Sequence, residues 1–318
     1  MGKSVGESVG LRRKRAAAKP VPEKPKPGTG LRSAVVKSPP ADLRHARILV
    51  TNDDGIHAPG LKVLEKIARA LSDDVWVVTP ESEHSGASHA LTLRRPLQIH
   101  RLGPKRYATS GTPTDCVLLA INHLVEGKRP DLVLSGVNRG ANLGEDVLYS
   151  GTVAAAMEAS MLGIPAIARS QVRLGEVLQW KTAERFGAEI VRRLVAMEWP
   201  DDLLMNVNFP PVPPEKVTGI AVGAQGRRKS AVQVIRGKDP FSRDVLWVGD
   251  FTNDDPEDPH SDLAVIARNA IAITPLHFDL TQGLMLKRMA GIFPGAKAAA
   301  QSRPAAKLKR KTRQGKQK

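Results

Sequence analysis

Cysteine is almost missing from this chain of 318 residues, which contains Cys116 alone. A single cysteine cannot form an intrachain disulfide, which excludes a disulfide-stapled scaffold and fits a reducing compartment. The chain also lacks any run of about 18 apolar residues, so we expect no membrane-spanning helix. The N-terminus is basic but has no apolar stretch of the kind found in secretory signals. We therefore expect a cytoplasmic protein without a membrane span.

Acidic residues are missing from residues 295–318, which carry nine Lys and Arg. Residues 1–44 are similar, with 11 Lys and Arg against three Asp and Glu. These two segments supply the formal charge of +16, because the residues between them hold 28 basic and 29 acidic side chains. Segments rich in Lys, Ala and Pro have little to bury. We expect disordered basic extensions, either without function or in nonspecific contact with a polyanion, around a near-neutral folded body at 45–294.

The first part of this body alternates between short apolar segments and amphipathic segments. Because strands separated by helices form parallel pairs with right-handed crossovers, the alternation predicts an α/β fold with a mostly parallel sheet. A short hairpin is predicted over 97–102 and 106–108. The predicted strands are 48–51, 75–79, 132–134 and 164–168, and the predicted helices are 59–70, 115–125, 153–162 and 180–197.

The pattern changes after residue 199. Strands are predicted at 203–209, 218–223 and 270–274, and a helix at 261–269. Residues 224–260 are irregular and hairpin-like, with Gly, Pro and many charged residues. A smaller C-terminal part that contains a hairpin is therefore expected.

The most informative motif is Asn52-Asp53-Asp54-Gly55, which directly follows the first predicted strand. Two adjacent carboxylates at the end of a buried strand repel each other and are costly to desolvate. A divalent cation would make the pair tolerable, and oxygen ligands suit Mg²⁺ or Mn²⁺. Open α/β sheets bind ligands beyond the carboxyl ends of their strands. The alternative is that Asp54 caps the helix that begins near Pro59.

Three further polar loops are expected to meet this motif at one edge of the sheet: 85–88, 111–115, and 135–144 with its continuation to 149–152. Gly, Ser and Thr turns at helix starts can bind phosphate through backbone N–H groups. A metal beside such a turn implies phosphoryl chemistry on a small anionic substrate. Neither a P-loop motif nor GxGxxG occurs, so we do not expect a P-loop NTPase or a dinucleotide-binding fold.

Several of these residues also have ordinary structural interpretations. Ser85 and Ser88 suit any polar loop, and Asn138 among glycines suits a left-handed turn. Cys116, at the head of a predicted helix, is interpreted as a core residue. The remaining polar side chains near the loops are His57, His84, His89 and Arg139. Two alternatives stay open for them: they donate protons or bind phosphate, or they are simply exposed to solvent.

Taken together, the motifs resemble those of the survival protein E (SurE) family of metal-dependent nucleoside-monophosphate phosphatases. The combination is specific, whereas each motif alone is not, and the basic extensions lie outside the family core. The matching segments, in the family's order, are NDDGIHAPG at 52–60, SGAS at 85–88, GTPTDC at 111–116, SGVN at 135–138 and YSGTVAAAME at 149–158.

The resemblance implies one divalent metal ion per subunit, Mg²⁺ or Mn²⁺, held by Asp53, Asp54, Ser85 and Asn138. It implies a Rossmann-like, three-layer α/β domain with an extended hairpin, mapped here to about 224–260, that builds a homo-dimer or tetramer. The implied reaction is hydrolysis of nucleoside 5′-monophosphates, and also of 3′-monophosphates, to nucleoside and phosphate. Some members of the family also shorten polyphosphate.

On this hypothesis Asp53 and Asp54 are the catalytic residues, since the ion that they hold polarises a water for in-line attack on phosphorus. Backbone amides of two segments would stabilise the phosphate oxygens; they are Gly86, Ala87 and Ser88, and Ser150, Gly151 and Thr152. Three alternatives remain. They are covalent attack by Asp53, a metal hydrolase that cleaves phosphodiester or glycosidic bonds, and a nucleic-acid-binding or assembly protein that acts through its basic extensions.

Overall fold

The structure is a computed structural model that describes residues 39–200, 202–228, 232–249 and 256–293. The two predicted basic extensions lie outside these residues, except for residues 39–44. Leu43 within that short stretch is buried in the main hydrophobic core. The packed part of the chain therefore includes residues before the expected boundary at 45.

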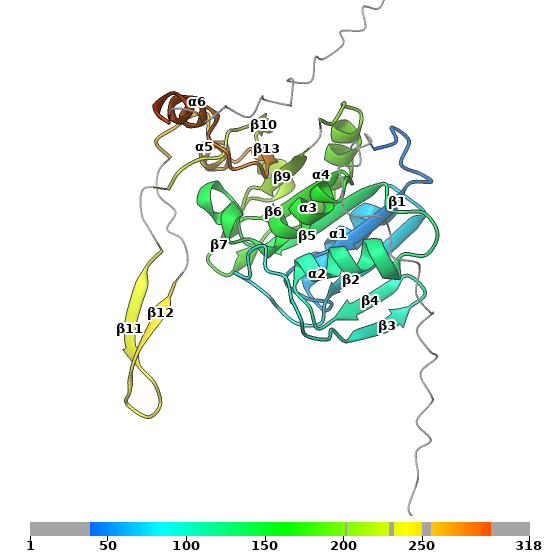
Figure 1. Cartoon of the computed structure of the whole chain (residues 1–318), viewed down its shortest axis with the longest axis horizontal. Coiled ribbons are helices and arrows are strands. Elements are labelled where there is room, and N and C mark those ends of the chain that lie inside the picture. Colours follow the sequence, from blue (N-terminus) through cyan, green and yellow to red (C-terminus); the bar gives the residue numbers. More distant parts are fainter. Residues whose placement is uncertain (1–38, 201, 229–231, 250–255, 294–318) are drawn as a thin grey trace, which may run out of the picture. The chain divides into compact units, whose positions relative to one another are not determined.

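The described residues form one nine-stranded sheet, whose order can be followed in Figure 1. The central strands run parallel, whereas β3 is antiparallel to β4, and β13 is antiparallel to β9. The predicted mostly parallel sheet is confirmed. Across the sheet the strands are β10 (Ile220–Val222), β13 (Ile271–His277), β9 (Leu203–Phe209), β6 (Ala166–Gln171), β5 (Leu132–Arg139), β1 (Arg47–Thr51), β2 (Asp74–Pro80), β4 (Arg106–Thr109) and β3 (Ile99–Gly103).

Helices cover both faces of the sheet, which gives the expected three layers. On one face α1 (Pro59–Arg69) and α4 (Trp180–Val195) bury their apolar sides in the larger core cluster. On the other face α2 (Pro113–Leu119) and α3 (Gly151–Met161) pack in a second cluster. The small residues of α3 let it approach the sheet closely, since side-chain size sets the distance between packed layers.

Shorter elements complete the fold. A π-helical turn η1 (Ala120–Leu124) continues α2, and two 3₁₀ turns occur at η2 (Gly144–Leu148) and η3 (Pro214–Lys216). Two antiparallel hairpins are formed by β7 (Arg173–Leu174) with β8 (Val177–Leu178), and by β11 (Val234–Lys238) with β12 (Asp244–Val248). The last helices are α5 (Asp262–Ala267) and α6 (Gly283–Ile292). None of the helices in the described residues is long and apolar enough to cross a membrane.

The sequence did not predict α6, because no residue of that helix is buried and its apolar side chains give no periodic signal of a packed face. It also ended the strand at 132–134 too early. β5 continues through the polar residues to Arg139, with a register shift against β6 between Ser135 and Asn138. Such a local irregularity redirects side chains at the end of a strand.

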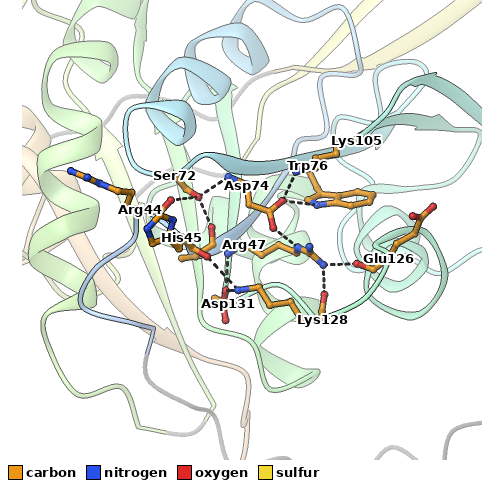
Figure 2. Close-up of polar contacts among 11 residues, drawn as sticks. Arg44, His45, Arg47, Ser72, Asp74, Trp76, Lys105, Glu126, Lys128 and Asp131 are labelled. Atoms are coloured by element: carbon orange, nitrogen blue, oxygen red, sulfur yellow. Dashed lines mark hydrogen bonds and ion pairs between the residues drawn. The ribbon is translucent and has the colours of Figure 1, made fainter.

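The amino ends of the central strands are joined by a polar network around Arg47 and Asp74 (Figure 2). The Nε of Arg47 donates to Asp74 Oδ2 at 2.7 Å, and its Nη1 donates to the carbonyl oxygens of Glu126 and Lys128. Asp74 also accepts from Lys105 Nζ at 2.8 Å. This network ties β1 and β2 to the loop before β5. It lies at the end of the strands opposite to the polar loops that are expected to bind ligand.

The chain reverses its direction of winding at β1. From β1 the next strand, β2, is added on one side, and β5 is later added on the other side. The carboxyl ends of two such neighbouring strands leave a crevice between their diverging loops. Asp53 and Asp54 follow β1, and Asn138 lies at the end of β5, so the sheet topology brings these residues to that crevice.

Candidate functional site

A tight turn carries the two carboxylates out of β1. Asn52 is buried, and its Nδ2 donates to the Gly55 carbonyl oxygen at 2.9 Å. Gly55 has a φ of 91°, and a Cβ at this position would lie 3.0 Å from a backbone carbon of Ser82. Glycine alone suits both constraints. The N-cap of α1 is Ala58, and no side chain caps this helix, so Asp54 does not serve as its cap.

Asp53 lies against the first turn of α3. It is 3% exposed. Its Oδ1 accepts a hydrogen bond from Thr152 Oγ1, and its carboxylate also accepts from the backbone N–H of Thr152. A Cβ on Gly151 would lie 2.8 Å from the Asp53 Cβ, so a glycine there allows this close approach. The positive end of α3 therefore faces the Asp53 carboxylate.

Burial disfavours the charged form of both carboxylates, and the charge of Asp53 adds repulsion at Asp54. Burial raises the pKa of Asp53, and the hydrogen bonds from Thr152 only partly oppose this effect. Burial, followed by the neighbouring charge of Asp53, raises the pKa of Asp54 to about 7. The backbone N–H of Arg139, 3.2 Å from Asp54 Oδ2, opposes the rise. The charge of Arg139 also lowers the pKa of Asp54, but burial and the charge of Asp53 outweigh it.

Asn138 reaches the same place from β5. Its Nδ2 donates to the Gly140 carbonyl oxygen at 3.2 Å, which directs this amide group without burying it. The chain bends just before it at Gly136, where φ is 120° and a Cβ would lie 2.2 Å from the Arg169 carbonyl oxygen. The left-handed turn interpretation of Asn138 is not what the structure shows, because Asn138 belongs to β5 and has no positive φ.

Ser85 lies on the exposed loop after β2. Its Oγ donates to Glu83 Oε1 at 2.7 Å, which places a third carboxylate beside the hydroxyl. Glu83 also contributes to the raised pKa of Asp54, after burial and Asp53. The sequence did not single out Glu83, since one acidic residue in a polar loop carries no distinctive pattern.

One cavity of about 740 Å³ joins these residues. Its wall includes all four residues expected to hold a metal, Asp53, Asp54, Ser85 and Asn138. Of the residues expected near phosphate it includes Gly86 and Ser150. The remaining lining residues are Glu83, Arg139, Gly140, Ala141, Asn142, Asp146, Tyr149, Val172, Arg173, Gly175, Glu176 and Arg228.

The other residues expected near phosphate lie behind this wall. The hydroxyl and the backbone N–H of Thr152 both donate hydrogen bonds to the Asp53 carboxylate, and Gly151 packs against Asp53. The N–H of Ala87 donates to the His84 carbonyl oxygen, at 3.2 Å. The hydroxyl and backbone N–H of Ser88 donate to the carbonyl oxygens of Leu148 and Tyr149. Of the two segments, Gly86 and Ser150 are the members that face the cavity.

Other side chains near the loops have structural surroundings. Cys116 is fully buried, and burial raises the pKa of its thiol to about 12, so it is a core residue as predicted. Thr112 caps α2 in a reciprocal pair with Asp115. His57, His84 and His89 are not among the residues that line the cavity.

Two ion pairs at the cavity were not anticipated from the sequence. Arg139 Nη2 lies 3.3 Å from Glu176 Oε2 on the β7–β8 hairpin, and both side chains are largely exposed. Arg228 donates to both oxygens of Asp146, and both side chains of this pair are buried. Partners 37 and 82 residues apart cannot be recognised from sequence spacing.

The donor set fits a hard divalent cation. Two carboxylates, a hydroxyl and an amide oxygen around one cavity are ligand types that Mg²⁺ and Mn²⁺ prefer. The mutual destabilisation of Asp53 and Asp54 is what a bound cation would relieve. No cluster of three or more His, Cys, Asp or Glu suited to a metal is found within the described residues. A metal at this cavity would therefore depend on Ser85 and Asn138 as well as on the carboxylates.

Comparison with known sequences agrees with the motifs. The sequence model of the family described as Survival protein SurE matches residues 48–232. The chain is 54% identical, over 244 residues, to the 5′-nucleotidase SurE of Paramagnetospirillum magneticum, and the match covers 76% of this chain and 94% of that protein. It is 50% identical, over 255 residues, to the 5′-nucleotidase SurE of Caulobacter vibrioides, covering 79% of this chain and 97% of that protein.

A solved structure shares the fold. The SurE protein from Aquifex aeolicus is 35% identical in sequence and superposes with a TM-score of 0.68. The match covers 77% of this chain and 99% of that one. The similarity therefore extends over nearly the whole of each of these relatives.

Proposed function

The chain belongs to the SurE family, and we propose that it is a metal-dependent 5′-nucleotidase, which hydrolyses nucleoside monophosphates to nucleoside and phosphate. The observation that supports this most strongly is the carboxylate pair of buried Asp53 and half-buried Asp54. Both have raised pKa values, and they line one cavity together with Ser85 and Asn138. This cavity lies at the carboxyl ends of β1 and β5, where open α/β sheets bind ligands.

We propose one Mg²⁺ or Mn²⁺ ion per subunit, held by Asp53, Asp54, Ser85 and Asn138; when bound, the ion would supply positive charge to the phosphate and a more acidic water. The protein's own groups would orient the substrate around it. Thr152 fixes the Asp53 carboxylate. Gly86 and Ser150 at the cavity wall, together with the Arg139 guanidinium, would contact phosphate oxygens.

The substrate range follows from the same cavity. Its volume of about 740 Å³ accommodates a nucleotide. We therefore propose broad activity on nucleoside 5′-monophosphates, with 3′-monophosphates and short polyphosphate as further substrates. Assembly as a homo-dimer or tetramer and a location in the cytoplasm are also proposed, and they can be tested by light scattering and cell fractionation.

The decisive experiment is phosphate release from a panel of nucleoside monophosphates, first in EDTA and then with Mg²⁺ or Mn²⁺ restored. We expect release only with metal, and we expect Asp54→Asn to reduce it by at least about 1,000-fold, because the site loses one of two charged ligands. Full activity of Asp54→Asn would contradict the assignment.

Thermal unfolding provides the control for this experiment. Asp54→Asn removes the repulsion between Asp53 and Asp54, so in EDTA the variant should unfold at a temperature no lower than that of the original protein. Loss of activity in a folded variant then reports on chemistry and not on misfolding.

A further inference from the structure

Ser85 is the one proposed metal ligand that no strand positions. Asp53 and Asp54 are separated from β1 only by Asn52, and Asn138 lies within β5, where it pairs with Ser170 of β6. Ser85 instead lies on the segment between β2 and β3, residues 81–98, which has no helix or strand and is mostly exposed. Its distance from the carboxylates therefore depends on what anchors this segment.

Backbone hydrogen bonds anchor the segment on both sides of Ser85. Before it, the N–H of His84 donates to the Asp53 carbonyl oxygen at 2.8 Å. After it, Ser88 donates from its N–H to the Tyr149 carbonyl oxygen at 3.1 Å, and from its Oγ to the Leu148 carbonyl oxygen at 2.7 Å. These contacts reach the residues that lead into α3.

The next residue, His89, makes a side-chain contact with α3 itself. Its Nε2 lies 2.9 Å from Glu158 Oε2, and the Glu158 side chain is only 9% exposed. Glu158 is the one charged residue in α3, which otherwise consists of small, hydroxyl and apolar residues. A buried carboxylate without a partner would be strongly unfavourable, so the contact with His89 stabilises Glu158 in its buried position.

One rigid helix thus supports two parts of the site. Thr152 in the first turn of α3 holds the Asp53 carboxylate, and Glu158 further along holds His89. Most of α3 is buried, and it packs on β5 and β6. Because α3 contacts both Asp53 and the loop that carries Ser85, it holds these two parts of the site at a fixed distance from each other.

We propose that His89 and Glu158 are a positioning pair, which holds the loop 85–88 where Ser85 can complete a site for a divalent cation with Asp53 and Asp54. The proposal rests on the proposed function, because it concerns the same site. His89 and Glu158 are not among the residues that line the cavity, so they act through the loop and do not touch the substrate.

The experiment measures Mn²⁺ binding to the nucleotide-free full chain by calorimetry, and phosphate release as a function of Mn²⁺ concentration. We expect His89→Ala and Glu158→Leu each to weaken Mn²⁺ binding about tenfold, as is usual when groups that orient ligands are removed. The double variant should bind no more weakly than the weaker single variant, because both changes break one contact. Glu158→Gln keeps an oxygen that accepts from His89 and should restore most of the affinity.

A second His–Glu pair provides a matched control. His100 Nε2 lies 3.4 Å from Glu81 Oε2, and both of these side chains are exposed. We expect His100→Ala to leave Mn²⁺ binding unchanged. If Glu158→Leu fails to fold, Mn²⁺ binding is compared between His89→Ala and Glu158→Gln instead. Thermal unfolding checks that both variants are folded.

The outcomes separate this proposal from the proposed function. Unchanged Mn²⁺ affinity in a folded His89→Ala variant, or losses that add in the double variant, would overturn the positioning role while leaving the nucleotidase standing. If the original protein bound no Mn²⁺ and released no phosphate with any metal, both proposals would be overturned.

Discussion

Single residues in this protein show where burial of charge is offset and where it is not. Asp53 is buried, but it receives two hydrogen bonds from Thr152 and faces the start of a helix. Asp54 is more open to the cavity, and its pKa is raised to about 7. Both carboxylates are unfavourable in the protein alone. A site built for a cation should have this character, because the ion supplies the missing charge.

Arg169 is a different case, since it is not among the residues that line the cavity. It is fully buried on β6, and its Nε, Nη1 and Nη2 have no hydrogen-bond partner among the described residues. Burial lowers the pKa of this guanidinium to about 9. An unpaired buried cation opposes folding.

We expect Arg169→Leu to increase the free energy of unfolding by about 1–4 kcal/mol at pH 7, since an apolar side chain replaces a buried charge. The gain should shrink as the pH rises above about 9, because the folded protein then releases the Arg169 proton while the unfolded chain keeps it to a higher pH. Urea unfolding at pH 7 and pH 10 measures both effects.

The exposed Arg185 on α4 is the control for this substitution. Arg185→Leu should change stability by no more than about 0.5 kcal/mol. A loss of stability in Arg169→Leu would mean that the guanidinium has a favourable partner in solution.

At the scale of elements, the two ends of the central strands differ in what their residues do. The carboxyl ends carry the site, while the amino ends are held by the network of Arg47, Asp74 and Lys105 (Figure 2). Trp76 takes part from β2, because its Nε1 donates to Asp74 Oδ1 at 3.0 Å and Arg47 lies over its ring. One carboxylate therefore joins several charged and aromatic side chains.

We expect Asp74→Ala to destabilise the fold by about 1–3 kcal/mol without changing the affinity for substrate, because hydrogen bonds to a charged group are lost far from the cavity. Burial alone would raise the pKa of Asp74, but the hydrogen bonds from Lys105 and Arg47 outweigh it and lower the pKa. The stabilisation is therefore present above pH 3.8 and is lost as the pH falls below it.

Thermal unfolding and nucleotide hydrolysis of the same samples check this expectation. The control is Asp244→Ala, which removes an exposed ion pair with Lys238 on the β11–β12 hairpin. If Asp74→Ala impaired hydrolysis at a temperature where it is fully folded, the separation of the two strand ends would be refuted.

At the scale of the whole molecule, the β11–β12 hairpin exposes several large apolar side chains to solvent. Val234, Leu246 and Val248 are each more than 60% exposed. Strand pairing places Val234 opposite Val248, and Leu246 lies two residues before it, so the three share one face. An apolar face of this kind indicates a contact with another protein surface.

We expect the double substitution Leu246→Lys and Val248→Lys to reduce the molecular mass measured by light scattering, because two charges would enter the proposed interface between subunits. The matched control places lysines at Leu174 and Val177, exposed residues of the β7–β8 hairpin, and should keep the original mass. An unchanged mass in the β11–β12 variant would remove this hairpin from the interface.

The basic extensions give one more prediction at this scale. Deletion of residues 2–38 should leave nucleotide hydrolysis unchanged, since the site and the core lie within later residues. Deletion to residue 44 should lower stability, because it removes the buried Leu43. Strong, salt-sensitive binding of RNA or DNA by the full chain, lost on removal of both extensions, would instead support a role in polyanion binding.

Much of the fold and part of the site could be predicted from the sequence. Alternation of apolar segments and amphipathic segments placed β1, α1, β2 and α4 to within a few residues, because burial of one face leaves a local periodic signal. The helix α6 was missed, since it buries no residue. The continuation of β5 to Arg139 was missed because its polar residues resemble a loop.

The sequence by itself determined the parallel α/β sheet and the carboxylate pair at the end of its first strand, since both follow from local patterns of burial and charge. Only the tertiary structure decided which groups support that pair. Thr152 meets Asp53 across 99 residues, and His89 meets Glu158 across 69. Such contacts depend on how helices pack on the sheet and on how loops close. Local sequence patterns do not encode that geometry.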